Sequence, residues 1–520
     1  MQRYNILWAD DEIDLLKPHI LFLNDRGYDV TPVTSGADAI DAIESTPYDV
    51  VFLDENMPGM TGLETLNYIK GIRPALPVVM ITKNEEEHIM EEAIGSKIAD
   101  YLIKPLNPNQ ILISVKRLLD NKRLVSERTN ANYQQDFQNI SKKVNDRIDH
   151  KEWAEIYKKM VYWELEIDRT ENKSMADILD MQKIEANSNF SKFIEEEYHY
   201  WLNSQEEDKP LISSELMKEK VFPQLSDEPL FFILIDNLRY DQWKIIQEDI
   251  EDYFNIEVED SYYSILPTTT AYARNSIFSG ELPLEMSKKY PQLWVTDDDT
   301  EEGKNNHEKE FLEANLKKNH LEITHSYHKV IHSNQGKQLN DNFNNLLNNQ
   351  LNVVVYNFVD MLSHARTDIR MIKELAADES AYRSLTRSWF QHSPLLELLK
   401  MISNKGLKVI ITTDHGTYRV KKPFKIAGDR NVNTNLRYKQ GKNLGYKGTS
   451  GIIEVRKPDD YHLPKPNVST SYVFATEDTF FAYPNDYNRY VKYYKDTFQH
   501  GGVSMEEMII PIVTLASKKS

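Results

Sequence analysis

Three runs of apolar residues in the second half of the chain each lead into a carboxylate. The runs and their carboxylates are residues 230–235 with Asp236, residues 353–359 with Asp360, and residues 409–413 with Asp414. Continuous apolar runs of this kind are typical of strands buried on both faces of a parallel sheet. Open α/β sheets place their sites beyond the carboxyl ends of such strands. The pattern therefore predicts that the three carboxylates meet at one edge of a sheet.

The region up to residue 120 alternates between strand-like and helix-like segments. The expected strands are residues 5–9, 28–33, 50–53, 77–81 and 100–103. Between them, the spacing of Ala37, Ile40 and Ile43 follows one face of a helix. This βαβ rhythm predicts a parallel sheet of about five strands.

Residues 121–215 are polar and charged and carry almost no strand signal. Asp149 and Glu152 have the spacing of a capping box, which marks the start of a helix. Apolar side chains then recur at helical spacing, at Trp153, Ile156, Tyr157, Met160, Trp163 and Ile167. We interpret them as the ordinary core of a helical bundle that acts as a spacer or a dimerisation element.

From residue 216 to the end the chain is again α/β in pattern, with polar inserts at residues 296–302 and 334–352. A chain of 520 residues is too long for one compact core, so we expect about three or four domains. Hydrophobic residues make up 40% and charged residues 28%, which fits a soluble globular protein.

The net charge is −19, which argues against a genome-binding protein. Cysteine is absent, so disulfides and thiol catalysis are excluded, and any metal must use histidine and oxygen ligands. Acidic residues follow within the first ten or so positions, before the core of a signal peptide could form. No apolar run approaches the roughly 18 residues that a membrane span needs. We expect a cytoplasmic protein.

Polar residues of the first region converge on the carboxyl edge of its predicted sheet. Asp10 and Asp11 follow the first strand, Asp54 ends the third, Thr82 ends the fourth, and Lys104 follows the fifth. An aspartate that accepts a phosphoryl group needs a hard cation, and Mg²⁺ prefers oxygen ligands. Asp11, Asp54 and the backbone carbonyl of Asn56 would hold Mg²⁺, and Asp10 would act through water.

Lys104 would neutralise phosphoryl oxygens, and Thr82 could donate a hydrogen bond to the acyl phosphate. This set resembles the receiver domain of two-component response regulators, which has a flavodoxin-like fold. The resemblance implies that a sensor histidine kinase supplies the phosphoryl group to Asp54. It also implies that Tyr101 is a switch aromatic that turns inward when Thr82 moves. The sequence shows no helix-turn-helix, so we expect no sequence-specific DNA-binding domain and an output in the last region.

Histidines accompany the carboxylates of the last region. His364 follows Asp360 by four residues, and a helical turn would bring both to one face. His415 is adjacent to Asp414, so a turn at a strand end would direct the two side chains towards neighbouring ions. His500 begins a His-Gly-Gly segment. Carboxylate and imidazole ligands suit Zn²⁺ or Mn²⁺, and two ions about 3.5–4 Å apart can clamp a phosphoryl transfer.

Residues 267–280 have the form of a turn that enters a helix. A hydroxyl at a helix N-terminus beside a metal loses its proton readily, so Thr270 is a candidate nucleophile. Arg274 lies one helical turn further on and could contact a phosphate that Thr270 attacks. The alternative is that the run of three threonines only caps a helix.

The metal pattern resembles the alkaline phosphatase superfamily over residues 225–515. The resemblance implies one ion held by Asp360, His364 and His500, and another held by Asp236, Asp414 and His415. Asp236-Asn-Leu-Arg239-Tyr-Asp241 is similar to the PglZ branch, and we expect Arg239 to contact the substrate. The order of receiver, helical linker and PglZ domain is similar to that of response regulators linked to type IX secretion in Bacteroidetes.

We therefore predict an α/β multidomain chain with three parts: a flavodoxin-like receiver (1–120), a helical bundle linker (121–215) and an alkaline-phosphatase-like α/β domain (216–520). Nine basic residues and interspersed aromatics lie between Arg419 and Lys447. Lys421, Lys422 and Lys425 could attract phosphates, and the aromatics could stack on bases. The alternative is a solvated basic loop, or a contact with acidic parts of the same chain.

Two functions fit these patterns. In the first, phosphorylation of Asp54 controls a zinc-dependent phosphodiesterase or phosphatase that acts on nucleotide or oligonucleotide phosphodiesters, and the chain forms a homodimer. In the second, the last region holds metal for structural reasons and recruits a sigma factor or a secretion-system protein.

Overall fold

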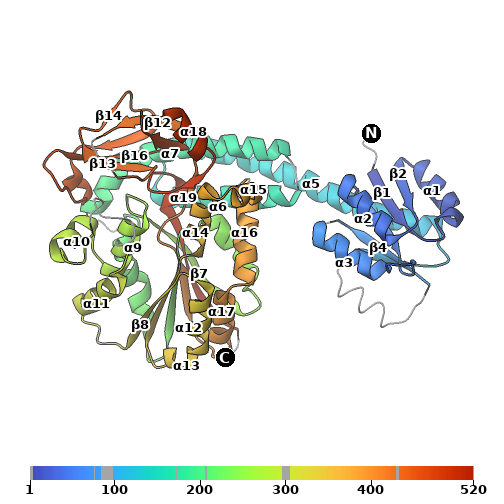
Figure 1. Cartoon of the computed structure of the whole chain (residues 1–520), viewed down its shortest axis with the longest axis horizontal. Coiled ribbons are helices and arrows are strands. Elements are labelled where there is room, and N and C mark those ends of the chain that lie inside the picture. Colours follow the sequence, from blue (N-terminus) through green and yellow to red (C-terminus); the bar gives the residue numbers. More distant parts are fainter. Residues whose placement is uncertain are drawn as a thin grey trace. The chain divides into compact units, whose positions relative to one another are not determined.

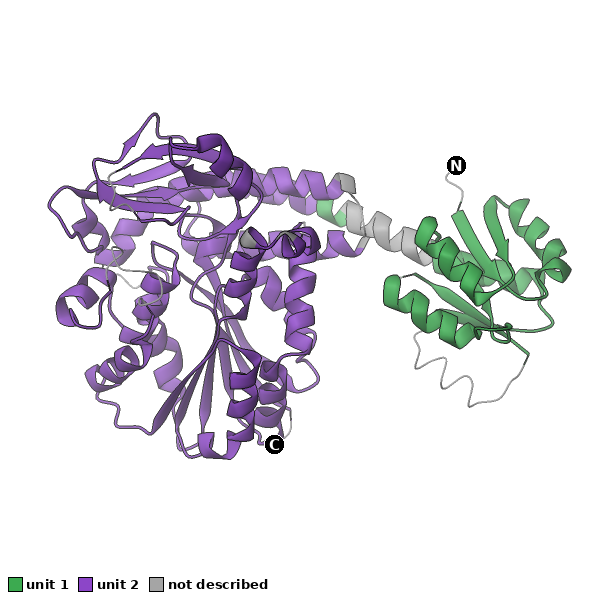
Figure 2. Cartoon of the chain, in the orientation of Figure 1, with its two compact units in different colours: residues 1–134 green, residues 135–520 purple. Residues whose placement is uncertain are grey.

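The computed structural model describes residues 4–74, 76–83, 98–170, 173–204, 208–295, 305–376, 378–428 and 433–518. The polar insert at residues 296–302 and Arg430 lie outside these ranges. The chain forms two compact units, residues 1–134 and residues 135–520 (Figure 2).

The first unit is a five-stranded parallel sheet with helices on both faces (Figure 1). The strands have the order β2-β1-β3-β4-β5, and all five predicted strands are confirmed. Their bounds are β1 Tyr4–Ala9, β2 Tyr28–Val33, β3 Val50–Asp54, β4 Val78–Thr82 and β5 Asp100–Ile103. The helical segments are η1 Ile13–Leu16, α1 Lys17–Asn24, α2 Gly36–Ser45, α3 Gly62–Ile72 and α5 Pro108–Val144.

Each face of this sheet has its own apolar core. Trp8 and Phe52 point to the face covered by α1 and α5, where Ile111 and Val115 pack. The alternate residues of the same strands, such as Leu53, point to the face covered by α2 and α3. This alternation along β1 and β3 explains why both strands are apolar throughout.

The linker helices do not form a separate unit. Helix α5 runs through the predicted boundary at residue 120, and α6 (His150–Thr170) and α7 (Lys173–Asn203) belong to the second unit. The predicted capping box is present, because the Asp149 side chain accepts a hydrogen bond of 2.8 Å from the Glu152 amide. The six apolar residues of the predicted α6 face are buried.

The second unit is built on a six-stranded mixed sheet of order β7-β19-β10-β6-β9-β8. The bounds are β6 Leu230–Ile235, β7 Phe254–Tyr263, β8 His325–Val330, β9 Leu351–Tyr356, β10 Val409–Thr412 and β19 Ile509–Ser517. The four strands β10, β6, β9 and β8 are parallel, and β19 pairs antiparallel with both β10 and β7. Strands β6, β9 and β10 are buried along their whole length, as their apolar runs predict.

Helices surround this sheet. Between β6 and β10 they are α8 Tyr240–Gln247, α9 Thr270–Ser279, α10 Pro283–Lys289, α11 Glu308–Lys318, α12 Ser333–Asp341, α13 Phe343–Leu346, α14 Phe358–Asp368, α15 Arg370–Leu375, α16 Glu379–Gln391 and α17 Pro394–Asn404. Short helical turns occupy η2 Ser213–Glu215, η3 Met217–Val221, η4 Phe222–Gln224 and η6 Pro458–Tyr461. The run at residues 353–359 is only partly a strand, because β9 ends at Tyr356 and α14 begins at Phe358.

A smaller β region follows β10 and returns the chain to the sheet edge. Its strands are β11 Tyr418–Arg419, β12 Lys422–Ala427, β13 Tyr438–Lys442, β14 Gly445–Tyr446, β15 Ile452–Val455, β16 Thr470–Ala475, β17 Thr479–Ala482 and β18 Phe498–Gln499. They form small sheets of orders β11-β18, β14-β12-β17 and β13-β16-β15. The last helices are α18 Tyr487–Tyr494 and α19 Met505–Met508. Among the described residues, no helix is both long and apolar enough to cross a membrane.

Candidate metal centre and phosphoacceptor site

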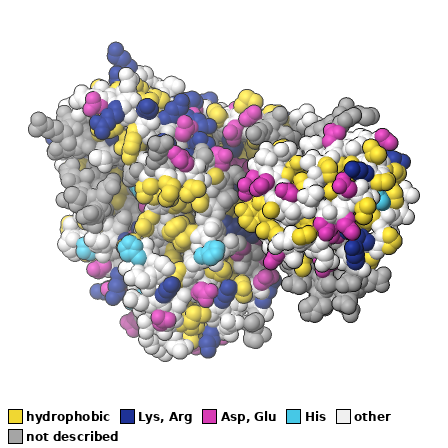
Figure 3. Space-filling view, turned by 45° about the vertical axis from the view of Figure 1, so that its right-hand side comes forward, with side chains coloured by type: hydrophobic (Ala, Val, Ile, Leu, Met, Phe, Trp, Pro, Cys, Tyr) yellow, Lys and Arg dark blue, Asp and Glu magenta, His cyan; other side chains and the backbone are white. Residues whose placement is uncertain are grey.

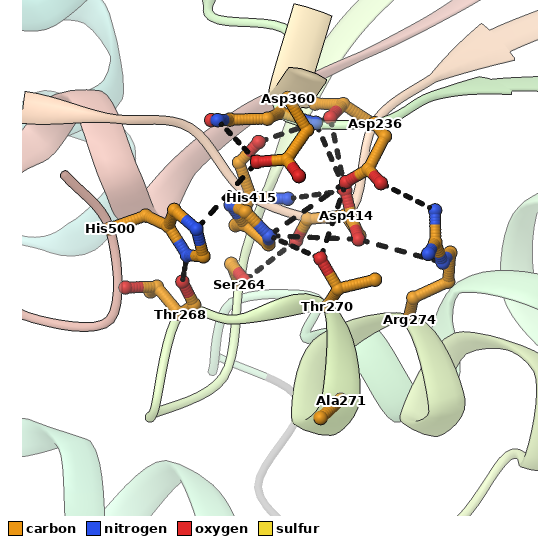
Figure 4. A network of polar contacts seen from close by, with 12 residues as sticks. Asp236, Ser264, Thr268, Thr270, Ala271, Arg274, Asp360, Asp414, His415 and His500 are labelled. Carbon is orange, nitrogen blue, oxygen red and sulfur yellow. Dashed lines mark hydrogen bonds and ion pairs between the residues drawn. The ribbon is translucent and has the colours of Figure 1, made fainter. Parts of the chain in front are cut away.

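The ends of β6 and β10 bring Asp236, Asp414 and His415 together. All three side chains are buried, and each offers a ligand atom within 4.8 Å of the others. The His415 Nε2 atom lies 4.0 Å from Asp236 Oδ1 and 3.8 Å from Asp414 Oδ2. Figure 4 shows these side chains turned towards one another above the first turn of α9. The predicted grouping of these three residues agrees with their positions.

A second group consists of Asp360, His364 and His500, whose ligand atoms also lie within 4.8 Å of one another. Asp360 and His364 both belong to α14, so the expected helical turn between them is present. His500 Nε2 lies 3.6 Å from Asp360 Oδ1, and His364 Nε2 lies 3.5 Å from Asp360 Oδ2. The rings of His415 and His500 stack with centroids 4.4 Å apart, which makes the two groups neighbours. His364 is 58% exposed, so this second group is open to solvent.

Two asparagines orient the carboxylates. Asn237 has a φ of 64°, and this left-handed turn directly after β6 lets it serve both groups. Its side-chain amide donates to Asp360 Oδ1 over 3.1 Å, and its backbone N–H donates to Asp414 Oδ1 over 3.3 Å. Asn357 donates to Asp236 Oδ2 over 2.9 Å. The sequence predicted a role for neither asparagine. The position of Asn237 directly after Asp236 could have indicated its role, whereas no sequence pattern marks Asn357.

The electrostatics of the cluster fit a cation. Burial raises the pKa of Asp236 well above its ordinary value, and burial also raises the pKa of Asp414. Burial opposes ionisation of Asp360 as well, but His364 and His500 lower its pKa on balance. Within the described part of the chain, Asp414 Oδ2 accepts no hydrogen bond although it is buried. A divalent cation would offset these buried charges.

Burial also keeps the imidazoles neutral, which is the form that binds metal. It lowers the pKa of His415, and together with the nearby His415 it lowers the pKa of His500 to about 3. The other ring nitrogens face backbone carbonyls: His415 Nδ1 is 3.2 Å from the Gly416 oxygen, and His500 Nδ1 is 3.3 Å from the Thr268 oxygen. These contacts direct Nε2 of both rings towards the carboxylates.

Thr270 stands between the ligand groups as the first residue of α9. Its Oγ1 lies 3.1 Å from His415 Nε2 and 3.3 Å from Asp236 Oδ1. The N-cap position belongs to Thr269, whose side chain makes no capping hydrogen bond, and Thr268 donates to the Gly502 carbonyl over 2.9 Å. The hydroxyl of Thr270 therefore faces the candidate metal centre and does not cap the helix.

Arg274 does not lie where the sequence prediction put it. Its guanidinium is fully buried, with Nη1 2.9 Å from Asp236 Oδ2 and Nε 2.6 Å from Glu308 Oε1. Burial opposes its charge, but Asp236 and Glu308 hold the pKa of Arg274 well above its ordinary value. A direct phosphate contact is contradicted by this burial. Arg274 instead holds Asp236 from behind, and Glu308, which no sequence signal marked, completes the pair.

Arg239 is also buried, which contradicts its predicted role as a substrate contact. Its Nη2 lies 2.6 Å from Asp241 Oδ2 and 2.6 Å from Glu379 Oε2. Asp241 is buried and Glu379 is half-buried, so the Arg239 guanidinium belongs to an internal network of ion pairs.

The basic stretch divides into buried and exposed parts. Arg437 is buried against Glu507, with Nη2 2.6 Å from Oε2, and Lys439 is buried as well. Lys422 and Lys425 are exposed on β12 and Lys421 is half-buried. Lys422 Nζ lies 3.0 Å from Asp478 Oδ1, and Lys425 Nζ lies 4.7 Å from the centre of the Tyr487 ring.

The first unit brings its predicted acidic residues together. Asp10 and Asp54 are buried, Asp11 is exposed, and their oxygens lie within 4.8 Å of one another. Lys104 Nζ lies 2.8 Å from Asp54 Oδ1 and 2.9 Å from Asp10 Oδ2. Burial raises the pKa of Asp54 even though Lys104 opposes this. Three oxygen donors and one lysine at this edge fit Mg²⁺ and a phosphoryl group.

The other predicted residues of this site surround the aspartates. Thr82 donates a hydrogen bond of 2.5 Å to Glu55 Oε2, and Asn56 is exposed in the loop after β3. Tyr101 is 43% exposed, so its ring points outward here.

Comparison with known families assigns each part of the chain. Residues 6–116 match the response regulator receiver domain, and residues 123–202 match the PorX response regulator linker domain. Residues 216–515 match the BREX system PglZ alkaline phosphatase-like domain. The first unit is thus a CheY-like receiver. The three matches together fit a PorX-like protein.

Two curated relatives are similar to about a quarter of this chain. The transcriptional regulatory protein ZraR of Escherichia coli O157:H7 is 31% identical over 24% of this chain and 29% of its own length. ResD of Bacillus subtilis is 31% identical over 22% of this chain and 47% of its own length. The chain thus spans less than half the length of these relatives.

Among solved structures, the chemotaxis protein CheY4 of Vibrio cholerae is 27% identical, with a TM-score of 0.22, over 22% of this chain and 99% of that chain. The receiver of a LuxO repressor from Vibrio parahaemolyticus is also 27% identical, with a TM-score of 0.23, over 24% of this chain and 95% of that chain. The PglZ match covers more than half of the chain, and on that ground the chain belongs to the family of PglZ alkaline phosphatase-like domains.

Proposed function

We propose that the chain is a response regulator whose output is a metal-dependent phosphodiesterase or phosphatase. The observation that carries this proposal is the position of Thr270. Its hydroxyl oxygen lies 3.1 Å from His415 Nε2 and 3.3 Å from Asp236 Oδ1, between two groups of metal-ligating side chains. A hydroxyl in this place is a nucleophile with ligands for two ions beside it.

The protein contributes position and charge to the reaction. Thr270 is the first residue of α9, so a phosphate at its hydroxyl would lie at the positive end of the helix dipole. Arg274 and Asn357 fix Asp236, and Asn237 fixes Asp360 and Asp414. Two divalent ions, when bound, would lower the pKa of the Thr270 hydroxyl and withdraw charge from the phosphate.

The proposed sequence has two displacements at phosphorus. Thr270 Oγ1 gives its proton to solvent and forms a bond to phosphorus as the ester bond to the leaving group breaks, and the leaving oxygen takes up a proton from water. Water then attacks the phosphothreonine, which restores the Thr270 hydroxyl and releases the second product. We propose zinc for the two ions, with manganese as the second choice for these ligands, and magnesium for the receiver.

The proposed substrates are nucleotide or oligonucleotide phosphodiesters. The exposed Lys425 on β12 supports this choice, since it adds positive charge to a chain of net charge −19, whereas the charge of Lys422 is balanced by Asp478. We further propose that phosphorylation of Asp54 by the histidine kinase favours a homodimer and controls the output. The PorX-type linker supports a role in regulating type IX secretion.

The test compares hydrolysis of bis(4-nitrophenyl) phosphate by the zinc-loaded wild type, Thr270→Val and Thr269→Val. Thr270→Val removes the nucleophile at nearly constant volume, so turnover should fall by about a thousandfold or more. Thr269→Val is the matched control, because that hydroxyl makes no capping bond, and it should retain turnover.

Metal content measured on the same samples completes the test. Two ions per chain with no turnover in the wild type would overturn the proposal. That result would favour the alternative, a metal-containing module that recruits a sigma factor or a secretion-system protein.

A further inference from the structure

Helix α18 (Tyr487–Tyr494) has two different faces. Tyr487, Val491 and Tyr494 recur at helical spacing and pack against the small core of Val420, Phe480 and Ala482. Tyr490 and Tyr493 lie on the adjoining face, with their ring centroids 6.2 and 4.8 Å from that of Tyr494, and are 40% and 44% exposed. Arg489 and Lys492 are exposed on the same outer side of the helix. The helix thus presents aromatic rings and positive charge together.

This helix lies beside the candidate metal centre. Arg366, two residues after His364 on α14, donates to the backbone carbonyl of Asp496, which follows α18 by two residues. Lys373 Nζ of α15 lies 3.5 Å from the carbonyl of Tyr493. The chain then runs through β18, which contacts α14, to His500. The C-terminal end of α18 is therefore tied to α14, the helix that carries the exposed His364.

Positive charge extends from α18 onto β12. Lys425 of β12 lies over the Tyr487 ring at 4.7 Å, and α18 contacts β17, the parallel neighbour of β12. Among the described residues, Arg489, Lys492 and Lys425 form no ion pair, although acidic residues outnumber basic ones 81 to 62 in the whole chain. Figure 3 shows Lys and Arg side chains beside hydrophobic ones at the top of the larger unit, where Figure 1 places α18 and β12.

We propose that α18 and β12 form a platform for single-stranded nucleic acid, which leads one phosphodiester to Thr270. This proposal rests on the proposed function and names the substrate surface. Bases would stack on Tyr490 and Tyr493, while Arg489, Lys492 and Lys425 would bind phosphates. Exposed rings next to cations without an acidic partner match a strand whose bases are free to stack. A duplex, whose bases are already stacked, would gain only the interactions with its phosphates.

The direct test is binding, measured by fluorescence anisotropy with a labelled single-stranded thymidine octamer. The full chain carries Thr270→Val so that the probe is not cleaved. Tyr490→Ala with Tyr493→Ala should raise the Kd roughly tenfold or more, because the bases can no longer stack on these rings. Tyr490→Phe with Tyr493→Phe keeps the rings and should bind like the parent. Tyr68→Ala, which removes a similarly exposed tyrosine in the receiver, is the control and should change nothing.

A salt series separates the basic residues from the rings. Arg489→Gln with Lys492→Gln should reduce the slope of log Kd against log salt by about 0.7 for each phosphate that the protein no longer neutralises. The tyrosine variants should leave that slope unchanged. An octamer Kd that is the same in the parent and the double alanine variant would overturn the platform, and so would equal affinity for a duplex of the same length.

Turnover distinguishes this proposal from the proposed function. In the Thr270→Val background, the platform is measured from affinity alone, without hydrolysis. With Thr270 present, hydrolysis of bis(4-nitrophenyl) phosphate by the wild type reports on the proposed centre alone, because this probe has no strand of bases to stack on Tyr490 and Tyr493. A wild type that hydrolyses the small probe, with an octamer affinity insensitive to the tyrosines, rejects the platform only. A wild type that hydrolyses neither substrate, with a tyrosine-dependent affinity, rejects the enzyme only.

Discussion

Asp236 makes different contacts through its two carboxylate oxygens. Oδ1 faces Thr270 and His415, whereas Oδ2 accepts hydrogen bonds from Arg274 and Asn357, each over 2.9 Å. The side chain therefore has one oxygen for the reaction and one oxygen that fixes its orientation. Asp360 lacks this division, since Oδ1 meets both Asn237 and His500 while Oδ2 meets His364. Residues that never touch substrate thus decide where the reactive oxygens lie.

Lys439 gives a prediction about stability and pH. Burial lowers its pKa from the usual 10.5 to about 7. Between these values the unfolded chain binds more protons than the folded chain, so this residue makes stability rise with pH across that window. At and below about pH 7, the folded protein bears nearly the full free-energy cost of burying the charged Lys439 side chain. Lys439→Met should therefore raise the unfolding free energy at pH 7 by on the order of 3 kcal/mol.

The gain from Lys439→Met should shrink towards zero near pH 10. Thermal unfolding of the wild type and the variant at both pH values measures this. Loss of the hydrogen bond of 2.7 Å from Lys439 to the Asn433 carbonyl will take away part of the gain at every pH. Lys442→Met on the same strand is the control, because Lys442 is only half-buried. A gain of equal size at pH 7 and pH 10 would contradict the assignment.

The site residues that the sequence predicts are those marked by a local pattern, and not those defined by contacts between distant segments. Asp236, Asp414 and His415 directly follow apolar runs, and Thr270 enters a helix after a turn, so local pattern was enough to find them. Glu308 and Asn357 could not be found this way, because their roles depend on packing against Arg274 and Asp236. From the sequence we predict substrate contacts for Arg274 and Arg239, because their buried acidic partners lie far away in the sequence or carry no sequence pattern. A sequence shows a charge but not its buried partner.

At the scale of elements, buried ion pairs connect the linker helices α6 and α7 to the segments that follow the candidate metal ligands. Arg383 of α16 lies 3.0 Å from Asp241 of α8 and 2.5 Å from Glu164 of α6, and it also pairs with Asp168 of α6. On α7, Lys183 Nζ lies 2.7 Å from Glu164. Helix α8 begins four residues after Asp236, so this network holds the turn that leaves β6.

The α7 helix also holds the segment after His500. Asn187 donates to Glu506 Oε2 over 3.0 Å, and Lys183 lies 3.6 Å from Glu506 Oε1. Glu506 belongs to α19, which begins five residues after His500. The linker thus contacts both the first and the last ligand-bearing turns of the proposed centre.

Removing Arg383 should be costly. Arg383→Met leaves Glu164, Asp168 and Asp241 without their shared cation in a largely buried place, which should lower the unfolding free energy by roughly 3–5 kcal/mol. Arg387→Met, one turn further along α16, is the matched control. Arg387 is 37% exposed and pairs with Asp249 and Glu248, so its loss should cost about 1 kcal/mol or less. Urea unfolding of both variants measures the difference, and equal losses would count against the network.

The elements were predicted with uneven success. Five receiver strands, the α6 face and the three buried runs were predicted because each repeats one pattern over several residues. The smaller β region was not, because strands such as β11 and β14 have two residues each and mix polar and apolar positions. The predicted linker agrees with the family model over residues 123–202, and its helices α6 and α7 pack within the second unit. Helical periodicity predicts a buried face and does not identify its partner.

At the scale of the whole molecule, the receiver should control assembly. Receivers commonly signal through paired surfaces, and Tyr101 points outward in this state. Beryllofluoride with Mg²⁺, which imitates the acyl phosphate on Asp54, should shift the full chain from monomer towards dimer. Multi-angle light scattering measures the mass. Asp54→Asn, which cannot accept the mimic, should stay monomeric, and an unchanged wild-type mass would contradict the prediction.

Strand β19 (Ile509–Ser517) has a consequence for how the second unit folds. It lies in the interior of the six-stranded sheet, between β10 and β7, and pairs with both. A chain cut before Ile509 would keep every ligand and the nucleophile, yet it would leave the buried apolar strand β10 with a bare edge and β7 without its partner strand. Such edges are templates for pairing with other chains. The sheet therefore closes only when a late segment inserts between strands made much earlier, a long-range step that is intrinsically slow and prone to aggregation.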